Sequence, residues 1–233
     1  MKPPQRALVV DDELETCKLM ERVLNSMGLE SVCITESSEA SRLLVRDKFA
    51  VIFVDDQMHF PDGPELVRQI RDSGYNRRAP IVLMSDDRQP HALTRGFEAG
   101  ASFFLYKPID KERLVRLVRA TQGAIELGLR RTRRVPLRAK VVLRIGNQEL
   151  EAETIDISME GVLVRAAQIL PIGSSVGVNL QFGDGLAPII GEGSVVRIEA
   201  RNQMGIHLSR LSAAESLRLQ EFLLPLVPEA SSA

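Results

Sequence analysis

The chain has 233 residues, which is enough for one or two domains, each with a hydrophobic core of its own. Hydrophobic residues make up 44% and charged residues 26%, and the formal net charge is −1. These values are typical of a globular protein and argue against a general nucleic-acid binder, which would show a strongly basic domain.

Cys17 and Cys33 are too few and too widely spaced for a disulfide framework or a zinc site. We expect them to be small core residues in a reducing compartment. The sequence shows neither the apolar region of a signal peptide nor a run of about 20 apolar residues that could cross a bilayer. We therefore expect a cytoplasmic protein that makes no use of a membrane.

Short apolar runs alternate with segments of helical spacing in the first half of the chain. The expected strands are 6–10, 30–35, 50–54, 80–84 and 102–106. The expected helices are 14–27, 38–46, 64–72, 91–99 and 111–127. Five buried strands that alternate with five helices predict an α/β fold with a doubly wound five-stranded parallel sheet.

Polar residues follow these strands at the edge where such sheets carry their sites, and they are Asp11, Asp12, Asp55, Ser85 and Lys107. Three converging carboxylates repel one another, and a hard divalent cation such as Mg²⁺ offsets the repulsion. A carboxylate beside that metal can accept a phosphoryl group as an aspartyl-phosphate, with a hydroxyl and an ammonium on its oxygens. Singly, each residue also fits a helix cap, a turn or a solvated charge. Their occurrence at successive strand ends favours a site.

Residues 6–122 resemble the receiver domain of two-component response regulators. Asp55 ends a strand, and Met58, Asp62 and Gly63 stand at the family's offsets in the loop behind it. Ser85 lies 30 positions after Asp55, and Lys107 lies a further 22 positions on, followed by Pro108. The resemblance implies a flavodoxin-like fold in which Asp55 accepts phosphate from a histidine kinase or a phosphotransfer protein.

The same resemblance assigns roles around Asp55. Asp12, Asp55 and the Gln57 carbonyl would ligate Mg²⁺, with Asp11 close by. Ser85 and Lys107 would sense the phosphoryl group, and the Lys107–Pro108 bond would be cis. Phe104 stands at the position of the switch aromatic, although a plain core aromatic explains it equally well. The chain would not be an enzyme beyond Mg²⁺-dependent phosphoacceptance and self-dephosphorylation.

Two residues depart from the family's pattern. Asp86 follows Ser85 where alanine or glycine is usual, so it could narrow the path of the phosphodonor or add negative charge. His59 stands where the loop usually has proline. Both leave phosphorylation of Asp55 as the expectation and put its rate and lifetime in question.

An arginine run follows the first half, LRRTRRVPLR at 129–138. By itself, this run fits a solvated linker, a nucleic-acid patch or a clamp for a phosphorylated ligand, because guanidinium forks bind phosphate and guanine. Arg130 and Arg134 are four apart, so both could reach one ligand. Whether the helix before this run extends into it or breaks near Gly123 is open.

The second half changes to a strand-like period with frequent turn residues. The expected strands are 139–145, 149–157, 161–166, 175–182, 189–198 and 204–208. Six short antiparallel strands predict a small six-stranded β-barrel, closed by a C-terminal helix at 213–224. The segment DISMEG at 156–161 stands out, although Asp-x-Ser-x-x-Gly is also ordinary turn chemistry.

Together with the arginine run, that segment resembles the PilZ domain, which binds cyclic di-GMP. Arg130 to Arg134 matches Arg-x-x-x-Arg, and Asp156 to Gly161 matches Asp-x-Ser-x-x-Gly. The resemblance covers about 129–224. It implies that Arg130 and Arg134 hold the ligand with help from Arg131. Asp156 and Ser158 would read guanine, and Gly161 would keep the barrel surface open.

These inferences give a receiver domain at 1–122, a linker with the arginine arm at 123–135, a PilZ barrel at 136–227 and a frayed tail at 228–233. We expect a response regulator with two inputs, phosphorylation of Asp55 and cyclic di-GMP, whose effects on a shared joint are coupled. Its downstream protein target is unknown, and a homodimer is compatible with the sequence. The alternatives are an adaptor that acts by protein contact without ligand and, less favoured, a DNA-binding regulator.

Overall fold

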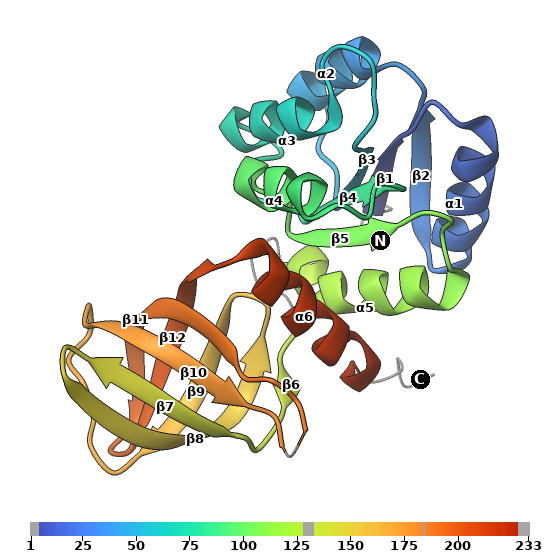
Figure 1. Cartoon of the computed structure of the whole chain (residues 1–233). Helices are drawn as coiled ribbons and strands as arrows, with labels where there is room; N and C mark the ends of the chain where they lie inside the picture. Colours follow the sequence, from blue (N-terminus) through green and yellow to red (C-terminus); the bar gives the residue numbers. More distant parts are fainter. Residues whose placement is uncertain (1–4, 128–132, 184, 228–233) are drawn as a thin grey trace. The chain divides into compact units, whose positions relative to one another are not determined.

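The structure is a computed structural model that describes residues 5–127, 133–183 and 185–227, with backbone alone over 122–127. The chain forms two compact units, and the boundary between them falls between Arg131 and Thr132. Each unit contains one β-sheet (Figure 1). Among the described helices, none combines the length and the apolar character needed to cross a membrane.

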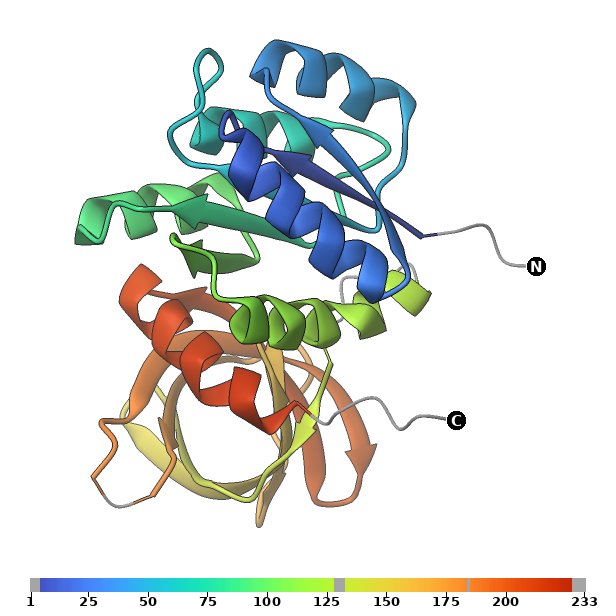
Figure 2. The same cartoon turned by 90° about the vertical axis from the view of Figure 1, so that its right-hand side faces the viewer.

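The first unit is a five-stranded parallel sheet between two helical layers. Its strands are β1 (Gln5–Val10), β2 (Leu29–Ile34), β3 (Val51–Asp55), β4 (Ile81–Ser85) and β5 (Phe103–Tyr106). Its helices are α1 (Leu14–Ser26), α2 (Ser37–Arg46), α3 (Gly63–Asp72), α4 (Pro90–Ala99) and α5 (Lys111–Leu127). The sheet order is β2-β1-β3-β4-β5, with α2, α3 and α4 on one face and α1 and α5 on the other (Figures 1 and 2). The predicted doubly wound fold is confirmed.

Strands β3 and β4 are buried along their whole length. They read as continuous apolar runs because helices cover both faces of a parallel sheet, which leaves no solvated side for polar residues. Helix α5 continues through Gly123 to Leu127, so it does not break near Gly123, and the part of the arginine run before Arg133 lies outside the described residues.

The second unit is an antiparallel barrel. Its strands are β6 (Val135–Pro136), β7 (Lys140–Ile145), β8 (Gln148–Ser158), β9 (Gly161–Ala166), β10 (Ser175–Gln181), β11 (Ile189–Ala200) and β12 (Gln203–Leu211). Strands β7 to β12 form a closed ring because β8 pairs with both β7 and β9 (Figure 2). The six-stranded barrel is therefore confirmed, and β6 is a short additional strand on β8. Helix α6 (Ala213–Leu223) and the short 3₁₀ helix η1 (Leu224–Leu226) follow.

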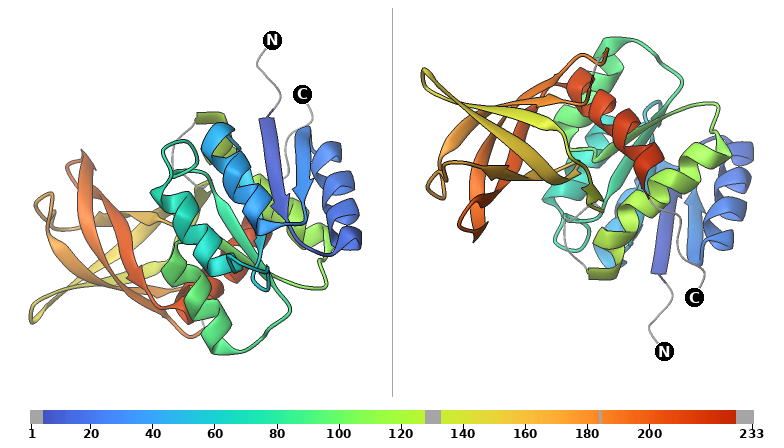
Figure 3. Two further views of the ribbon diagram at one scale, coloured as in Figure 1. Left: turned by 90° about the horizontal axis from the view of Figure 1, so that it is seen from above. Right: turned by 90° about the horizontal axis from the view of Figure 1, so that it is seen from below.

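Every second side chain along the barrel strand β10 is buried. Val176, Val178 and Leu180 of β10 are buried, whereas the residues between them are partly exposed. This period of two is what a strand with one solvated face requires. The register of β8 against β9 shifts between Thr154 and Asp156. Such a bulge re-aims the residues around it, and here it lies at Asp156. The long hairpins β7–β8 and β11–β12 can be followed in Figure 3.

Candidate functional site

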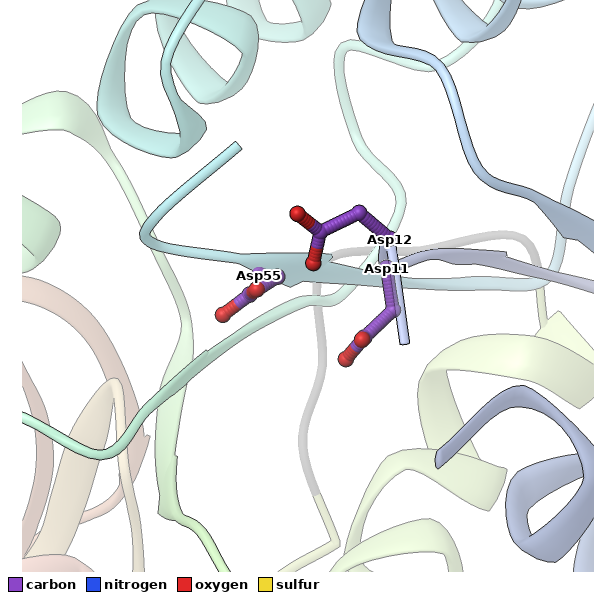
Figure 4. Close-up of side chains that lie close together, drawn as sticks. All are labelled: Asp11, Asp12 and Asp55. Atoms are coloured by element: carbon purple, nitrogen blue, oxygen red, sulfur yellow. The ribbon is translucent and has the colours of Figure 1, made fainter. Parts of the chain in front are cut away.

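Three carboxylates gather at the carboxyl edge of the parallel sheet. Asp11 and Asp12 follow β1, and Asp55 is the last residue of β3, the strand beside β1. One oxygen atom from each lies within 4.8 Å of the others, and the three side chains lie close together (Figure 4). Asp11 and Asp55 are buried, whereas Asp12 is exposed. The structure thus brings together the acidic residues that the sequence predicted.

Lys107, directly after β5, reaches into this cluster. Its Nζ lies 2.9 Å from Asp11 Oδ2 and 3.2 Å from Asp55 Oδ2. A third acid, Glu13, places Oε2 at 3.6 Å from the same Nζ. The lysine side chain is only 13% exposed, so its ammonium group is held between the two buried carboxylates.

Burial governs the protonation of this cluster. It raises the pKa of Asp11 and of Asp55, and the hydrogen bonds and charge of Lys107 offset this only in part. A backbone hydrogen bond from Gln57 also favours the ionised form of Asp55. Burial opposes the charge of Lys107, but the hydrogen bond to Asp11 and the two carboxylates leave the pKa of Lys107 raised, so the lysine stays charged. When its carboxylates are ionised, the cluster therefore carries more negative than positive charge.

That imbalance fits a hard cation. Three carboxylates face one ammonium group within the cluster. Mg²⁺ prefers oxygen ligands from one or two carboxylates and keeps several water molecules. Exposed Asp12 leaves the site open on one side to that water. Asp12 and Asp55 are thus suited to hold Mg²⁺, with Asp11 beside them.

We expect Mg²⁺ to stabilise the first unit in a pH-dependent way. Because the folded-state pKa values of Asp11 and Asp55 are raised, their stabilising contribution is present below their ordinary values and is lost as pH rises through the raised values. Mg²⁺ binds the ionised carboxylates. At 100 times its Kd it should add about 2.7 kcal/mol at pH 7.5, and less toward pH 5.

Thermal unfolding with and without Mg²⁺ at several pH values measures this effect. Asp12→Ala should remove the response. Asp72→Ala, at an exposed residue at the end of α3, should keep it. A Mg²⁺ effect of equal size at pH 5 and pH 7.5 would contradict the assignment.

Ser85 makes its hydrogen bonds within the loops at the sheet edge, and its phosphoryl-sensing role stays a prediction. It is the buried last residue of β4, and its hydroxyl donates to Asp56 Oδ2 at 3.3 Å while accepting from the Asp87 N–H at 3.0 Å. Asp56 is buried, and burial raises the pKa of its carboxyl group. The sequence pattern assigned no role to Asp56. It could have been found from its position, because Asp56 is an acidic residue directly after Asp55, where the chain leaves the sheet.

The two departures from the family's pattern lie beside the cluster. The carboxylate of Asp86 accepts a hydrogen bond from the Gln57 side-chain amide, and both side chains are exposed. Asp86 therefore has a partner in the loop that follows Asp55. His59 is exposed and lines, together with Asp12, a cavity of about 350 Å³.

Phe104 lies in the core of the first unit and is fully buried. Its ring meets that of Tyr106 edge-on, with centroids 5.0 Å apart. This placement agrees with the interpretation of Phe104 as a core aromatic residue. Its role as the switch aromatic stays a prediction. The Lys107–Pro108 peptide bond is cis, as the resemblance implied.

Gly63 lies against the backbone of Asp55. A Cβ atom at this position would stand 2.2 Å from the Asp55 carbonyl oxygen, so α3 can begin this close to the end of β3 only without a side chain at its first residue. We expect Gly63→Ala to lower the free energy of unfolding of the first unit by about 1–3 kcal/mol, the usual cost of overpacking. Chemical denaturation measures this. Gly74→Ala is the matched control because a Cβ there meets nothing within 4 Å, and an equal loss in both variants would contradict the account.

A second cluster lies where β6 meets β8 in the barrel. The Arg134 guanidinium group pairs with the Asp156 carboxylate, and their side chains are 33% and 23% exposed. Ser158 and Gly161 form the β8–β9 hairpin, and Ser158 Oγ donates to the Gly161 carbonyl at 3.2 Å. A Cβ on Gly161 would stand 2.5 Å from the Ile206 carbonyl and 3.5 Å from the Arg134 guanidinium group. The β8–β9 turn, which the sequence predicted, therefore contains Ser158 and Gly161 and lies beside the Arg134–Asp156 pair.

Two of the predicted ligand residues, Arg130 and Arg131, lie outside the described residues. Arg134, Asp156, Ser158 and Gly161 come together as the sequence suggested. The buried hydroxyl of Ser158 is engaged within its own hairpin. Its role in reading a base stays a prediction.

The fold and the sites define a class: an α/β signalling domain with an acidic cluster at its sheet edge, followed by a small closed barrel. Residues 7–119 match the family model of the response regulator receiver domain, and residues 128–224 match that of the PilZ domain. The chain belongs to the response regulators and carries a receiver domain followed by a PilZ domain.

Curated relatives match about half of the chain. The response regulator protein PilR of Pseudomonas aeruginosa is 34% identical over 116 residues, which is 49% of this chain and 25% of PilR. The peroxide stress-activated histidine kinase mak2 of Schizosaccharomyces pombe is 30% identical over 120 residues, which is 48% of this chain and 5% of mak2. The chain thus spans a quarter or less of the length of these relatives.

Solved structures support the fold of the first unit. A CheY-like receiver domain protein from Methanospirillum hungatei has a TM-score of 0.50 at 17% identity. The match covers 54% of this chain and 99% of the chain of that protein. The signal receiver domain of an HD domain-containing protein from Pseudomonas fluorescens has a TM-score of 0.51 at 16% identity, covering 55% and 93%. These likenesses concern the fold alone.

Proposed function

We propose that this response regulator is phosphorylated on Asp55 and that its PilZ domain binds cyclic di-GMP. The observation that carries the first half is the gathering of Asp11, Asp12 and Asp55, with the Lys107 ammonium group between Asp11 and Asp55. The phosphodonor is a histidine kinase or a phosphotransfer protein, because a receiver domain takes its phosphoryl group from such a partner. Mg²⁺ is the cofactor.

In this mechanism a carboxylate oxygen of Asp55 attacks the phosphorus of a phosphohistidine. The new O–P bond forms as the N–P bond of the donor breaks, and the histidine nitrogen leaves with its electron pair. Lys107, now shared between Asp11 and Asp55, is placed to pair with a phosphoryl oxygen. Bound Mg²⁺ supplies further charge neutralisation for the phosphoryl group. No other turnover is proposed beyond self-dephosphorylation.

A small phosphodonor tests this half without the cognate kinase. The full chain is incubated with acetyl phosphate and Mg²⁺, and the product is measured by phosphate-affinity electrophoresis and intact mass. We expect one phosphoryl group per chain, labile to hydroxylamine as an acyl phosphate is. A chain that stays unmodified under conditions that label another receiver domain would contradict the proposal.

The proposal for the barrel rests on Arg134, Asp156 and Gly161 lying together on one side of β8. A guanidinium fork suits the phosphates and guanine edges of a cyclic dinucleotide, and a carboxylate accepts from guanine N1–H and N2–H₂. A Cβ on Gly161 would stand 2.5 Å from the Ile206 carbonyl oxygen, so the close packing beside Arg134 requires glycine. Calorimetry with cyclic di-GMP tests it, and we expect saturable heat.

One observation favours the adaptor as the second candidate. Arg134 is already paired with Asp156, and Ser158 is bonded within its hairpin, so both could serve the barrel alone. An absence of heat with cyclic di-GMP would support that reading. Binding to duplex DNA that weakens steeply with salt would instead support the DNA-binding regulator. For each of these functions we propose that the protein acts in the cytoplasm on a downstream protein target that is unknown. A homodimer is compatible with all of them.

The two inputs are expected to be coupled. If phosphorylation and the ligand act on one two-state joint, each changes the affinity of the other by the same factor, typically 5- to 150-fold or about 1–3 kcal/mol. Calorimetry with cyclic di-GMP, with and without beryllofluoride as a phosphoryl mimic, measures this. Equal affinities in the two titrations would rule out the coupling and leave both sites standing.

A further inference from the structure

The two cysteines of the chain meet next to the acidic cluster. Cys17 lies on α1 and Cys33 on β2, and these two elements pack against each other (Figure 1). The Cys33 Sγ donates to the Cys17 carbonyl oxygen at 3.5 Å, so the side chain of Cys33 reaches the residue that carries the other thiol. The sequence analysis treated them as separate core residues, because 16 positions divide them in the sequence.

The two thiols have different surroundings. Cys17 is buried, whereas Cys33 is partly exposed. Their shared hydrogen bond raises the pKa of Cys17 and lowers the pKa of Cys33. A thiolate is the reactive form of cysteine, and a partly exposed thiol beside a second one is the usual arrangement of a redox-sensitive pair. Cys33 is therefore the residue that an oxidant would reach first.

Backbone contacts connect this pair to the phosphoacceptor site. Cys17 Sγ donates to the Asp11 carbonyl oxygen at 3.4 Å. On the other side, the Asp11 N–H donates at 3.1 Å to the carbonyl of Ile34, the residue after Cys33. The peptide groups of Asp11 are thus held by one thiol and by the neighbour of the other. Asp11 in turn holds Lys107.

We propose that Cys17 and Cys33 form a reversible disulfide under peroxide and that this bond restrains phosphorylation of the receiver domain. Closing the bond draws α1 and β2 together and removes the S–H donor of Cys17 from Asp11. The disulfide itself stands on the packing of α1 against β2 and on the contact of Cys33 Sγ with the Cys17 carbonyl. Its effect on phosphorylation rests on the proposed function of Asp55.

The chemistry balances with a peroxide as the oxidant. The Cys33 thiolate attacks one peroxide oxygen, the O–O bond breaks, and the departing oxygen takes up a proton to leave as water when the oxidant is hydrogen peroxide. Cys33 is then a sulfenic acid. Cys17 attacks its sulfur, the S–S bond forms, the S–O bond breaks, and a second water leaves with the Cys17 proton. Two thiols lose two electrons, and one hydrogen peroxide gains them. Disulfides in reducing compartments are commonly transient in this way.

The first experiment asks whether the bond forms. The full chain is reduced, desalted and treated with hydrogen peroxide, and intact mass and free-thiol titration are measured without reductant. We expect loss of two hydrogens and of both free thiols, with both restored by dithiothreitol. Cys17→Ser should instead leave a Cys33 sulfenic acid that dimedone traps, and Cys33→Ser should leave Cys17 reduced. Retention of both thiols, or a bond only between two chains, would overturn the proposal.

The second experiment asks whether the bond acts on the site. The initial rate of phosphorylation by acetyl phosphate is compared between oxidised and reduced chain, with the Cys33→Ser variant treated in the same way as the control. We expect a reduction of about fivefold or more in the oxidised wild type alone, the lower end of typical coupling. Equal rates in a chain shown to carry the disulfide would overturn the restraint.

The two failures are distinguishable. If the reduced chain takes up no phosphate at all, the proposed function of Asp55 fails while the mass measurement still decides the disulfide. Circular dichroism on both serine variants confirms that they fold. If Cys17→Ser does not fold, Cys33→Ser and the wild type still test the proposal, because they differ at the partly exposed residue.

Discussion

Replacing Asp55 by asparagine is expected to abolish phosphorylation by acetyl phosphate. An amide keeps the volume of the side chain and its contacts at the end of β3, but it is no nucleophile toward phosphorus. The loss should be complete within the sensitivity of phosphate-affinity electrophoresis, because no neighbouring carboxylate takes over a step that requires in-line positioning.

Asp56→Asn is the matched control for this prediction. Asp56 is the adjacent residue, it is also buried, and its carboxylate contacts Ser85 rather than Lys107. The variant should still accept one phosphoryl group per chain. Phosphate on Asp55→Asn together with its loss from Asp56→Asn would identify Asp56 as the acceptor and overturn the assignment.

Replacing Arg134 by alanine is expected to weaken the binding of cyclic di-GMP by about 100-fold, or about 2.8 kcal/mol. Removing one partner of a hydrogen-bonded charge pair at an interface typically costs 2–5 kcal/mol or more, about this size. The Arg134 guanidinium group pairs with Asp156 and lies beside Gly161. Calorimetry on the full chain measures the change in Kd.

Two further variants separate charge from geometry. Arg134→Lys keeps the positive charge but loses the planar fork, so we expect a loss of about tenfold. Arg138→Ala removes an exposed arginine from the same run and should change Kd by less than about threefold. A wild-type Kd in Arg134→Ala would mean that the ligand, if bound, is held elsewhere. Circular dichroism checks that the barrel remains folded.

The sequence predicted which residues form the acidic cluster, and the reason lies in the geometry of a parallel sheet. In a parallel sheet the carboxyl ends of all strands meet at one edge, so residues that follow successive apolar runs must converge. Asp11, Asp12, Asp55 and Lys107 needed only this rule to be brought together. The rule places residues at an edge. It does not choose their hydrogen-bond partners.

The partner of Ser85 shows where that rule stops. Sequence position placed Ser85 beside Asp55, but its hydroxyl faces Asp56 because the loop after β3 turns the second acid inward. Likewise, the pattern of the barrel suggested six strands. The pairing of Val135 and Pro136 with β8 adds a seventh, because two residues carry too little periodicity to be recognised as a strand.

The amino-acid order alone determined the two fold classes, a doubly wound parallel sheet and a small barrel, with most of their strands and helices and the residues that converge at the sheet edge. These follow from local periodicity, turn residues and the fixed direction of parallel strands. Tertiary packing alone decided that Cys17 meets Cys33, that Arg134 pairs with Asp156 and that Ser85 faces Asp56. The physical reason is that such contacts join residues whose distance depends on how whole elements pack, and a short stretch of sequence holds no record of that distance.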